Sequence, residues 1–235
     1  MLILGIETAT MAVGCASGGH EGILASFHAA RGRRHVETLA PAIEFTCRQS
    51  RIELSEISVV AVDIGPGRFS GLRVGVATAK AMASALRIPV VGVESLDLLA
   101  FPVRWSDRLI ASVVDARRGE VFSAFYRQVP GGVQRLSEPR VGAIGELTAE
   151  LLAIGEECLA VGDGALRWAD ELRALNTVEV ADPGLAHPSA ASLVQLAHAR
   201  ALREEFVNPW EVAPVYLRKA DAEINWAVRE SAGSS

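Results

Sequence analysis

The order of predicted elements runs twice along this chain, and this repetition constrains the fold more than any other feature. The first pass opens with apolar segments at 2–7, 12–17 and 22–28, whose turn-sized gaps predict an antiparallel meander. Helices and strands then alternate: a helix near 35–50, a strand at 58–64, a helix from Gly71 to about Arg87, a strand at 90–93 and a helix near 95–102.

The second pass repeats this order without repeating the residues. It comprises strands at 109–115, 120–127 and about 133–140, a helix near 143–154, a strand at 158–162, and helices near 164–174 and 189–205. Two passes predict a duplicated α/β fold of two lobes, each a mixed sheet with flanking helices. We expect lobes at 1–102 and 103–228 and a frayed tail at 229–235, since FPVRWSD interrupts the periodicity near 100–108.

The composition predicts a globular, cytoplasmic protein. Half of the 235 residues are hydrophobic and 22% are charged, which provides a substantial core. A net charge of −5 argues against tight nucleic-acid binding by the chain alone. Cys15, Cys47 and Cys158 lie far apart and are expected to be reduced, buried thiols. The apolar start is too short for a signal peptide, and no apolar run reaches the ~18 residues that span a bilayer, so no membrane contact is expected.

A glycine-rich turn, Gly65-Pro66-Gly67, follows the strand at 58–64 and leads into a helix of small residues. Glycine permits a tight turn with positive φ, and Ser70 is a plausible N-cap for the helix. The spacing matches neither G-x-G-x-x-G nor the P-loop, because Leu72 and Arg73 follow Gly71. We therefore favour docking over phosphate binding for this segment.

Small residues line this helix in two rows, Gly71/Gly75/Ala79/Ala83 and Ala77/Ala81/Ala85. A helix that is small and apolar on most sides is buried on more than one side. One side is expected to meet the helix's own sheet. The other side meets either a second helix of this chain or a second subunit, and the helix by itself leaves these two alternatives even.

The preceding helix favours a second subunit. Its inward stripe is predicted to be Val36, Leu39, Ala40, Ile43 and Cys47, with Phe45 on the opposite side. Pro41 predicts a kink or a break. An outward aromatic residue beside small residues is typical of an interface. The predicted partner interface consists of His35, Thr38, Pro41, Ala42, Phe45, Arg68, Phe69, Leu72, Arg73, Gly75, Val76, Ala79, Lys80 and Ala83.

Two turns opened by an acid occupy matching places in the two passes. A duplicated fold would make them face each other across a cleft, as the phosphate loops of actin-like and sugar-kinase-like ATPases do. A phosphate loop needs glycine, and the first turn has none while the second has one. We therefore expect a degenerate or weak nucleotide cleft. Its residues are Glu7, Thr8 and Thr10 of the first turn and Asp115, Arg117, Arg118 and Gly119 of the second.

Five segments in order resemble one family over residues 1 to about 220: IETAT, RGRRHVETLAPAI, GPGRFSGLRVGVATAKAMA, DARRGEVF and APVYLRKA. The chain resembles the bacterial TsaB family of tRNA threonylcarbamoyladenosine biosynthesis proteins. The resemblance implies an actin-like (ASKHA) fold and a non-catalytic role beside the TsaD transferase paralogue and the TsaE ATPase. It also implies a homodimer of the isolated chain through the same helical face, and contact with tRNA only through the complex.

The transferase paralogue carries a His-x-x-x-His metal motif, whereas residues 93–100 here contain no histidine. No metal site and no catalytic residue are predicted, and at most weak ATP or ADP binding is expected, within the complex. Two departures from the family pattern are Glu7 in place of Asp and Arg68-Phe69-Ser70 in place of Ser-Phe-Thr.

Two alternatives remain open. The chain could be an actin-like ATPase or phosphotransferase that uses Glu7 and Asp115 around Mg²⁺-nucleotide. The Arg31–His35 cluster and Arg218-Lys219 could contact RNA, although ordinary solvated charges are the preferred interpretation.

Overall fold

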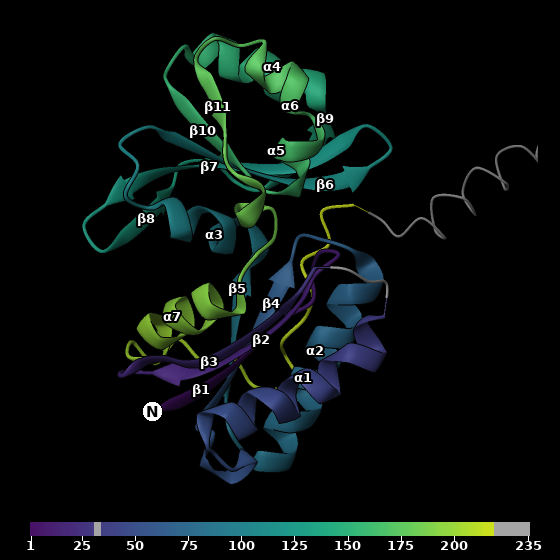
Figure 1. The fold of residues 1–235 in the computed structure, drawn as a ribbon, viewed down its shortest axis with the longest axis vertical. Coiled ribbons are helices and arrows are strands. Elements are labelled where there is room, and N and C mark those ends of the chain that lie inside the picture. The colour runs from purple at the N-terminus through teal and green to yellow at the C-terminus, as the bar shows by residue number, and fades with distance from the viewer. Residues whose placement is uncertain (31–33, 219–235) are drawn as a thin grey trace, which may run out of the picture.

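The chain folds into two lobes stacked along the long axis of the molecule (Figure 1). The computed structural model describes residues 1–30 and 34–218. The first lobe contains the strands β1 (Leu2–Glu7), β2 (Val13–Gly19), β3 (Gly22–Ala29), β4 (Val59–Gly65) and β5 (Val90–Glu94). Its helices in this stretch are α1 (His35–Ser50) and α2 (Phe69–Leu86), with the short helix η1 (Leu54–Glu56) between them.

The second lobe follows α3 (Ser95–Ala100) and the short helix η2 (Phe101–Val103). Its strands are β6 (Leu109–Arg117), β7 (Glu120–Val129), β8 (Gly132–Arg135), β9 (Arg140–Ala143), β10 (Cys158–Val161) and β11 (Val178–Val180). Its helices are α4 (Ile144–Ile154), α5 (Asp163–Arg167) and α6 (Ala169–Arg173). The chain then passes through η3 (Pro183–Leu185) to α7 (Ala190–Ala201).

The two sheets have the same topology, which confirms the predicted duplicated α/β fold. The strand order is β3-β2-β1-β4-β5 in the first sheet and β8-β7-β6-β10-β11 in the second, with β9 paired to β7. In each sheet the first three strands pair antiparallel. The last two strands then extend the sheet in parallel from its first strand. The same order of elements in both halves of the sequence therefore gives the same strand order in both sheets.

Five local predictions differ from the structure. The strand expected near 133–140 is two strands, β8 and β9, and the helix expected near 164–174 divides at Trp168 into α5 and α6. The three-residue β11 has no counterpart in the sequence prediction, because so short a strand shows no periodicity. Ser70 is not the N-cap of α2, since that helix begins at Phe69, two residues before the expected start at Gly71, and its N-cap is Arg68. The helix α1 runs unbroken through Pro41.

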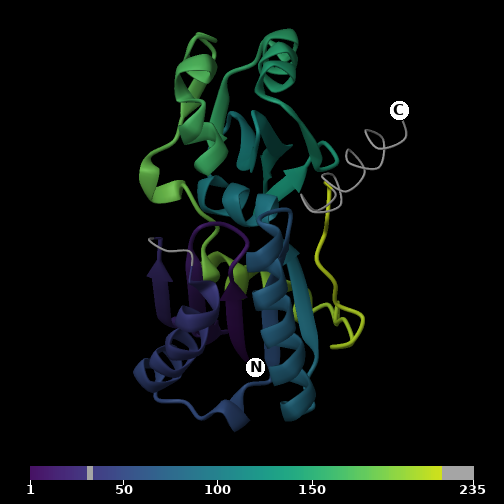
Figure 2. The same ribbon diagram turned by 90° about the vertical axis from the view of Figure 1, so that its right-hand side faces the viewer.

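The C-terminal segment returns to the first lobe, so the predicted division at 102/103 differs from the structure (Figure 2). α7 packs on the first sheet, where Leu193, Val194 and Ala197 are buried. Farther along, Val207 bridges Val90, and the N–H of Val215 donates to the carbonyl of Ile64 at 2.7 Å. The physical reason is burial: both faces of the first sheet are apolar, and each requires a cover.

The first lobe is therefore a three-layer unit. α1 and α2 cover one face, with a core that includes Leu4, Ile6 and Val60, and α7 covers the other, against Ile3 and Val59. Among the described residues, no helix is long and apolar enough to cross a membrane.

Candidate partner face and interlobe cleft

The first small-residue row of α2 faces its own lobe, not a partner. Gly71, Gly75, Ala79 and Ala83 are all buried. A side-chain Cβ at Gly71 would lie 2.1 Å from the backbone oxygen of Thr8, and one at Gly75 would lie 2.3 Å from the hydroxyl oxygen of Thr8. The glycines therefore let α2 approach the turn after β1, and the row packs internally.

This placement corrects half of the predicted interface. The members enclosed in the protein's own core, where a partner does not reach them, are His35, Ala42, Leu72, Gly75, Val76, Ala79 and Ala83. The predicted inward stripe of α1 is confirmed for Leu39, Ile43 and Cys47, which are buried. It is wrong for Val36, which is 74% exposed, and for Ala40, which is also exposed. Ala42 and Thr46 are buried instead, so the buried side of the helix is rotated slightly from the predicted one.

The remaining members lie at the surface of the first lobe. Phe45 is 39% exposed, with its ring edge-on to Phe27 at 6.1 Å and Arg48 stacked over it. Arg73 lies over the Phe69 ring with 3.9 Å between the guanidinium carbon and the ring centroid. The exposed or half-exposed members of the predicted set are Thr38, Pro41, Phe45, Arg68, Phe69, Arg73 and Lys80.

The second small-residue row of α2 belongs to this surface. Ala77, Ala81 and Ala85 are exposed and lie at four-residue spacing, one turn after Arg73. None of the three was in the predicted interface, which contained the buried Ala79 instead; residues two positions apart on a helix lie on opposite sides, so Ala77 faces outward. We use "α1–α2 face" for the exposed side of these two helices.

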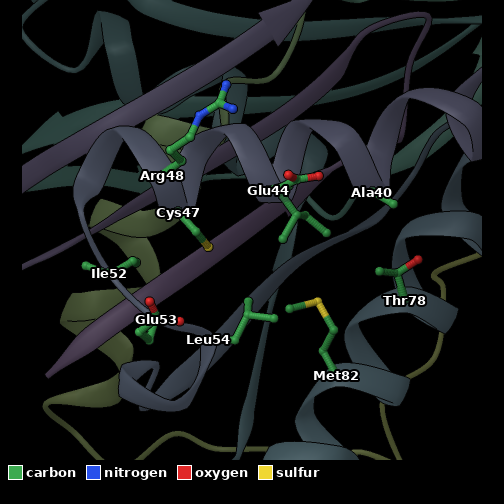
Figure 3. Close-up of a pocket in the computed structure, with 10 residues that line it drawn as sticks. Ala40, Glu44, Cys47, Arg48, Ile52, Glu53, Leu54, Thr78 and Met82 are labelled. Carbon is green, nitrogen blue, oxygen red and sulfur yellow. The ribbon is translucent and has the colours of Figure 1, made fainter.

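A groove of about 590 Å³ opens between α1 and α2 on this face (Figure 3). Apolar side chains of Ile43, Cys47 and Ile52 line it. Met82 of α2 faces Leu54 across the groove. Glu44, Arg48 and Glu53 stand at its margin. Leu54 is 46% exposed, so the groove presents apolar surface to the outside.

Buried acidic side chains lie where the two lobes meet. Glu7 is the last residue of β1 and Asp63 lies near the end of the neighbouring parallel strand β4, each one residue beyond the aligned pair Ile6 and Val62. Both carboxyls are fully buried. One oxygen of Glu7 accepts from the Ala9 N–H at 2.7 Å, and one oxygen of Asp63 accepts from Ser95 at 2.7 Å and Gly65 at 2.8 Å. The second oxygen of each has no partner among the described residues.

Burial disfavours the charged forms of both carboxyls. Burial raises the pKa of Asp63 to about 7. Burial, followed by the nearby Asp63 charge, raises the pKa of Glu7 well above its usual value. Two carboxyls that share a buried site resist double ionisation.

Asp63→Asn is therefore expected to stabilise the protein increasingly as pH rises. The folded-state pKa of Asp63 lies above the unfolded-state pKa. The contribution of this carboxyl to the free energy of unfolding is therefore fully present below about pH 4 and is lost as pH rises through 7. Asn keeps the oxygen that accepts from Ser95 and Gly65. Urea unfolding should show a gain on the order of 1 to 3 kcal/mol at pH 8 and little or none at pH 5. An equal gain at both pH values would contradict the assignment.

Asp163, which the sequence interpretation missed, connects the two acid-opened turns. Its carboxylate accepts from the N–H of Asp115 at 2.9 Å, and its charge raises the pKa of Glu7. Burial raises the pKa of Asp163 itself to about 6. The overlooked signal is Gly162-Asp163-Gly164 after a buried strand. Gly162 has φ +111°, and a Cβ there would lie 2.2 Å from the Val113 carbonyl oxygen.

The first turn, which joins β1 to β2, is held by hydrogen bonds to α1 and to the start of α2. Thr8 and Thr10 are buried, the Thr8 hydroxyl donates to the carbonyl of Gly71 at 2.8 Å, and the N–H of Arg68 donates to the carbonyl of Ala9 at 2.7 Å. His35 bonds the carbonyl of Thr10 at 3.0 Å. The N–H of Ala9 is engaged by Glu7. The turn is thus a packing element that joins α1 and α2 to the sheet.

The second turn is a tight hairpin. Arg117, Arg118 and Gly119 have φ values of 67°, 56° and 82°. Asp115 is held by Arg167 at 3.2 Å and Arg117 at 3.6 Å. The structure therefore brings the predicted cleft residues of both turns to the same interlobe region, with Asp163 between them.

One of the RNA-contact candidates has an internal role. Arg218 donates to the carbonyl of Ala116 at 2.9 Å and to Glu120 at 2.8 Å, which anchors the C-terminal segment to the second lobe. Arg31, Arg33, Lys219 and the expected tail at 229–235 lie outside the described residues.

Comparison with known proteins identifies the family. Residues 23–226 match the family model described as TsaD, tRNA N6-adenosine threonylcarbamoyltransferase. The Bacillus subtilis tRNA threonylcarbamoyladenosine biosynthesis protein TsaB is 28% identical over 96% of this chain and 98% of its own length. The chain belongs to the TsaB (YeaZ) family. The crystal structure of YeaZ from Pseudomonas aeruginosa superposes with a TM-score of 0.76 at 23% identity, covering 92% of this chain and 99% of YeaZ.

These matches confirm the resemblance to TsaB and the actin-like fold. An uncharacterised Mycobacterium leprae protein, ML0378, is 36% identical over 94% of this chain. This TsaB-family chain spans only 56% of that relative, so ML0378 contains a further region that this chain does not match.

Proposed function

We propose that this chain is a non-catalytic subunit that binds and activates a TsaD-type threonylcarbamoyltransferase, together with a TsaE-type ATPase, in the formation of threonylcarbamoyladenosine beside the anticodon of tRNA. The names of the TsaB relatives and the TsaD family model support the pathway. The chain would contact tRNA through the complex. In isolation the same face would pair two copies of the chain.

The observation that carries the proposal is the α1–α2 face. A helical layer that covers a sheet is normally polar outside, whereas here it presents exposed alanines, a half-exposed Phe45 and an apolar groove. Small residues let a second helix approach closely, and the groove receives its larger side chains. The charged margin, Glu44, Arg48 and Glu53, supplies the polar rim typical of an interface.

The interlobe region favours a supporting role over catalysis. In the first turn the N–H of Ala9 donates to Glu7 and the side chains of Thr8 and Thr10 are buried, so these groups are not available to a phosphate. We propose at most weak ATP or ADP binding. The competing proposal, an ATPase that uses Glu7 and Asp115, predicts micromolar Mg²⁺-ATP binding by calorimetry and turnover that Asp115→Ala abolishes. That result would replace the subunit proposal.

The subunit proposal predicts that Ala77→Arg abolishes capture of the TsaD-type paralogue. An arginine on the exposed row prevents close helix contact, so affinity should fall at least ~30-fold, equivalent to about 2 kcal/mol. Phe45→Asp should weaken capture in the same direction. The measurements are pull-down and reconstituted tRNA modification, with the circular dichroism spectrum and Tm of each variant unchanged.

A matched control is Leu152→Arg on α4 of the second lobe. Leu152 is 68% exposed and lies on the opposite lobe, so this substitution should leave capture unaffected. Ala79→Arg does not serve as a test, because Ala79 is fully buried and the variant would disrupt the lobe itself. Full capture and full modification with folded Ala77→Arg would refute the proposed face.

A further inference from the structure

The helix α2 carries a stripe of positive charge beside its exposed alanine row. Arg73, Lys80 and the C-cap residue Arg87 recur at seven-residue spacing, close to two helical turns, so they share one side of the helix. We call these three residues the basic stripe. Between Asp63 and Glu94 the sequence has four basic residues and no acidic one, although acids outnumber bases by 28 to 23 in the whole chain. The stripe is therefore a local departure from the acidic character of the protein.

The basic stripe has no acidic partner in the part of the chain that the structure describes. All three side chains are at least partly exposed, and none forms an ion pair with another described residue. Exposed arginines on other surfaces do form such pairs, as Arg127 does with Glu156 and Arg203 with Glu205. Charges that the chain itself leaves unpaired are available to a partner of opposite sign.

Small side chains separate the charges of the basic stripe. Ala77 and Ser84 are exposed and lie between them, so the five residues follow one another in alternating steps of four and three. This is the spacing of a coiled-coil seam, in which a second helix lies along the first. Small residues let that second helix approach closely, and the longer basic side chains then reach carboxylates on it.

A second copy of this chain does not supply those carboxylates. Its α2 would bring the same basic stripe, and like charges that face each other oppose association. Its α1 contains Glu37 and Glu44, but Arg48 and the two cap residues Arg34 and Arg51 outnumber them. The charge of the stripe is therefore complementary to a different protein.

We propose that the basic stripe docks a helix of the partner protein that carries carboxylates at matching seven-residue spacing. The inference rests on the proposed function, under which that partner is the TsaD-type paralogue, and it adds the chemistry by which the two recognise each other. Opposite charges at the margin of an interface orient the partner and speed its association, while the exposed alanines provide the close contact.

The test compares capture of the TsaD-type paralogue by the native chain and by variants of Lys80 at low and high salt, about 0.05 M and 0.5 M NaCl. Native capture should weaken as salt rises, because salt screens exposed charges. Lys80→Glu should weaken capture at least ~10-fold at low salt, since like charges then face each other, and the deficit should shrink at high salt. Lys80→Arg keeps the charge and should capture the paralogue normally.

Arg173→Glu is the matched control, because it makes the same change of charge at an exposed position on α6 of the second lobe and should leave capture unchanged. The circular dichroism spectrum and Tm show that each variant is folded. Full capture by folded Lys80→Glu, with capture still lost in Ala77→Arg, would overturn the role of the basic stripe and leave the proposed function standing.

Two further results would also overturn the inference. If Lys80→Glu changed self-association of the isolated chain in sedimentation and left capture unchanged, the stripe would serve a second copy. If the native chain captured no paralogue at either salt concentration, the proposed function would fail and this inference with it.

Discussion

Gly71→Ala is expected to destabilise the protein by about 3 kcal/mol or more, at the upper end of what overpacking costs. The added methyl would lie 2.1 Å from the backbone oxygen of Thr8, far inside van der Waals contact. Thr8 cannot retreat, because its hydroxyl donates to the Gly71 carbonyl and its side chain is buried. For a chain of this size the expected loss lowers Tm by about 6 to 12 °C.

Gly145→Ala is the matched control, since it makes the same change in another helix. Nothing lies within 4 Å of a Cβ built at Gly145 in α4. Alanine there should be neutral or should stabilise by about 0.5 to 1 kcal/mol, because glycine loses more backbone entropy in a helix. If both substitutions gave the same small change in denaturant unfolding, close approach of α2 to the first turn would not be the role of Gly71.

Asp97→Ala is expected to cost about 3 kcal/mol, at the lower end for breaking a buried ion pair, because Arg135 keeps Glu94 and Arg200 keeps the Gly92 carbonyl as a partner. The Asp97 carboxylate accepts from Tyr126 at 2.9 Å, from Arg135 at 2.6 and 3.1 Å, and from Arg200 at 3.2 Å. Tyr126 and Arg135 belong to the second lobe, whereas Arg200 is on α7 of the first. Asp97 on α3 thus joins the two lobes through one side chain that is 14% exposed.

Two measurements separate this role from a general loss of packing. Denaturant unfolding should show the loss of stability, and limited proteolysis should become faster between 101 and 108, where the chain passes from one lobe to the other. Glu205→Ala removes the acid of an exposed pair with Arg203 and should change neither measurement. An Asp97→Ala variant as stable and as protease-resistant as the native chain would contradict the assignment.

The fold was predictable from the sequence, because strand and helix periodicities are local properties of the chain. Two passes of one order implied two sheets of one topology, and both sheets have it. The short elements were not predictable, since β11 has three residues and shows no period. The return of α7 to the first lobe was also not predictable, because an amphipathic helix does not specify which of two apolar sheets it covers.

The sequence identified the helices that form the candidate site but not which of their side chains are exposed. Both helices of the α1–α2 face were identified, yet Ala79 points inward and Ala77 outward. Four-residue spacing identifies rows but does not say which row faces the sheet. Asp163 was missed because its proximity to Asp115 depends on the pairing of β10 with β6, and its proximity to Glu7 depends on how the two lobes pack together.

The sequence by itself thus determined the duplicated architecture, the family, and the small-residue character of α2, since each is written in local pattern or in motifs. Only the tertiary structure decided which side of α2 is exposed and that Thr8 and Ala9 bond the first turn to the start of α2. The physical reason is that burial and long-range contact depend on how elements pack, and packing follows from shape and area summed over the whole chain.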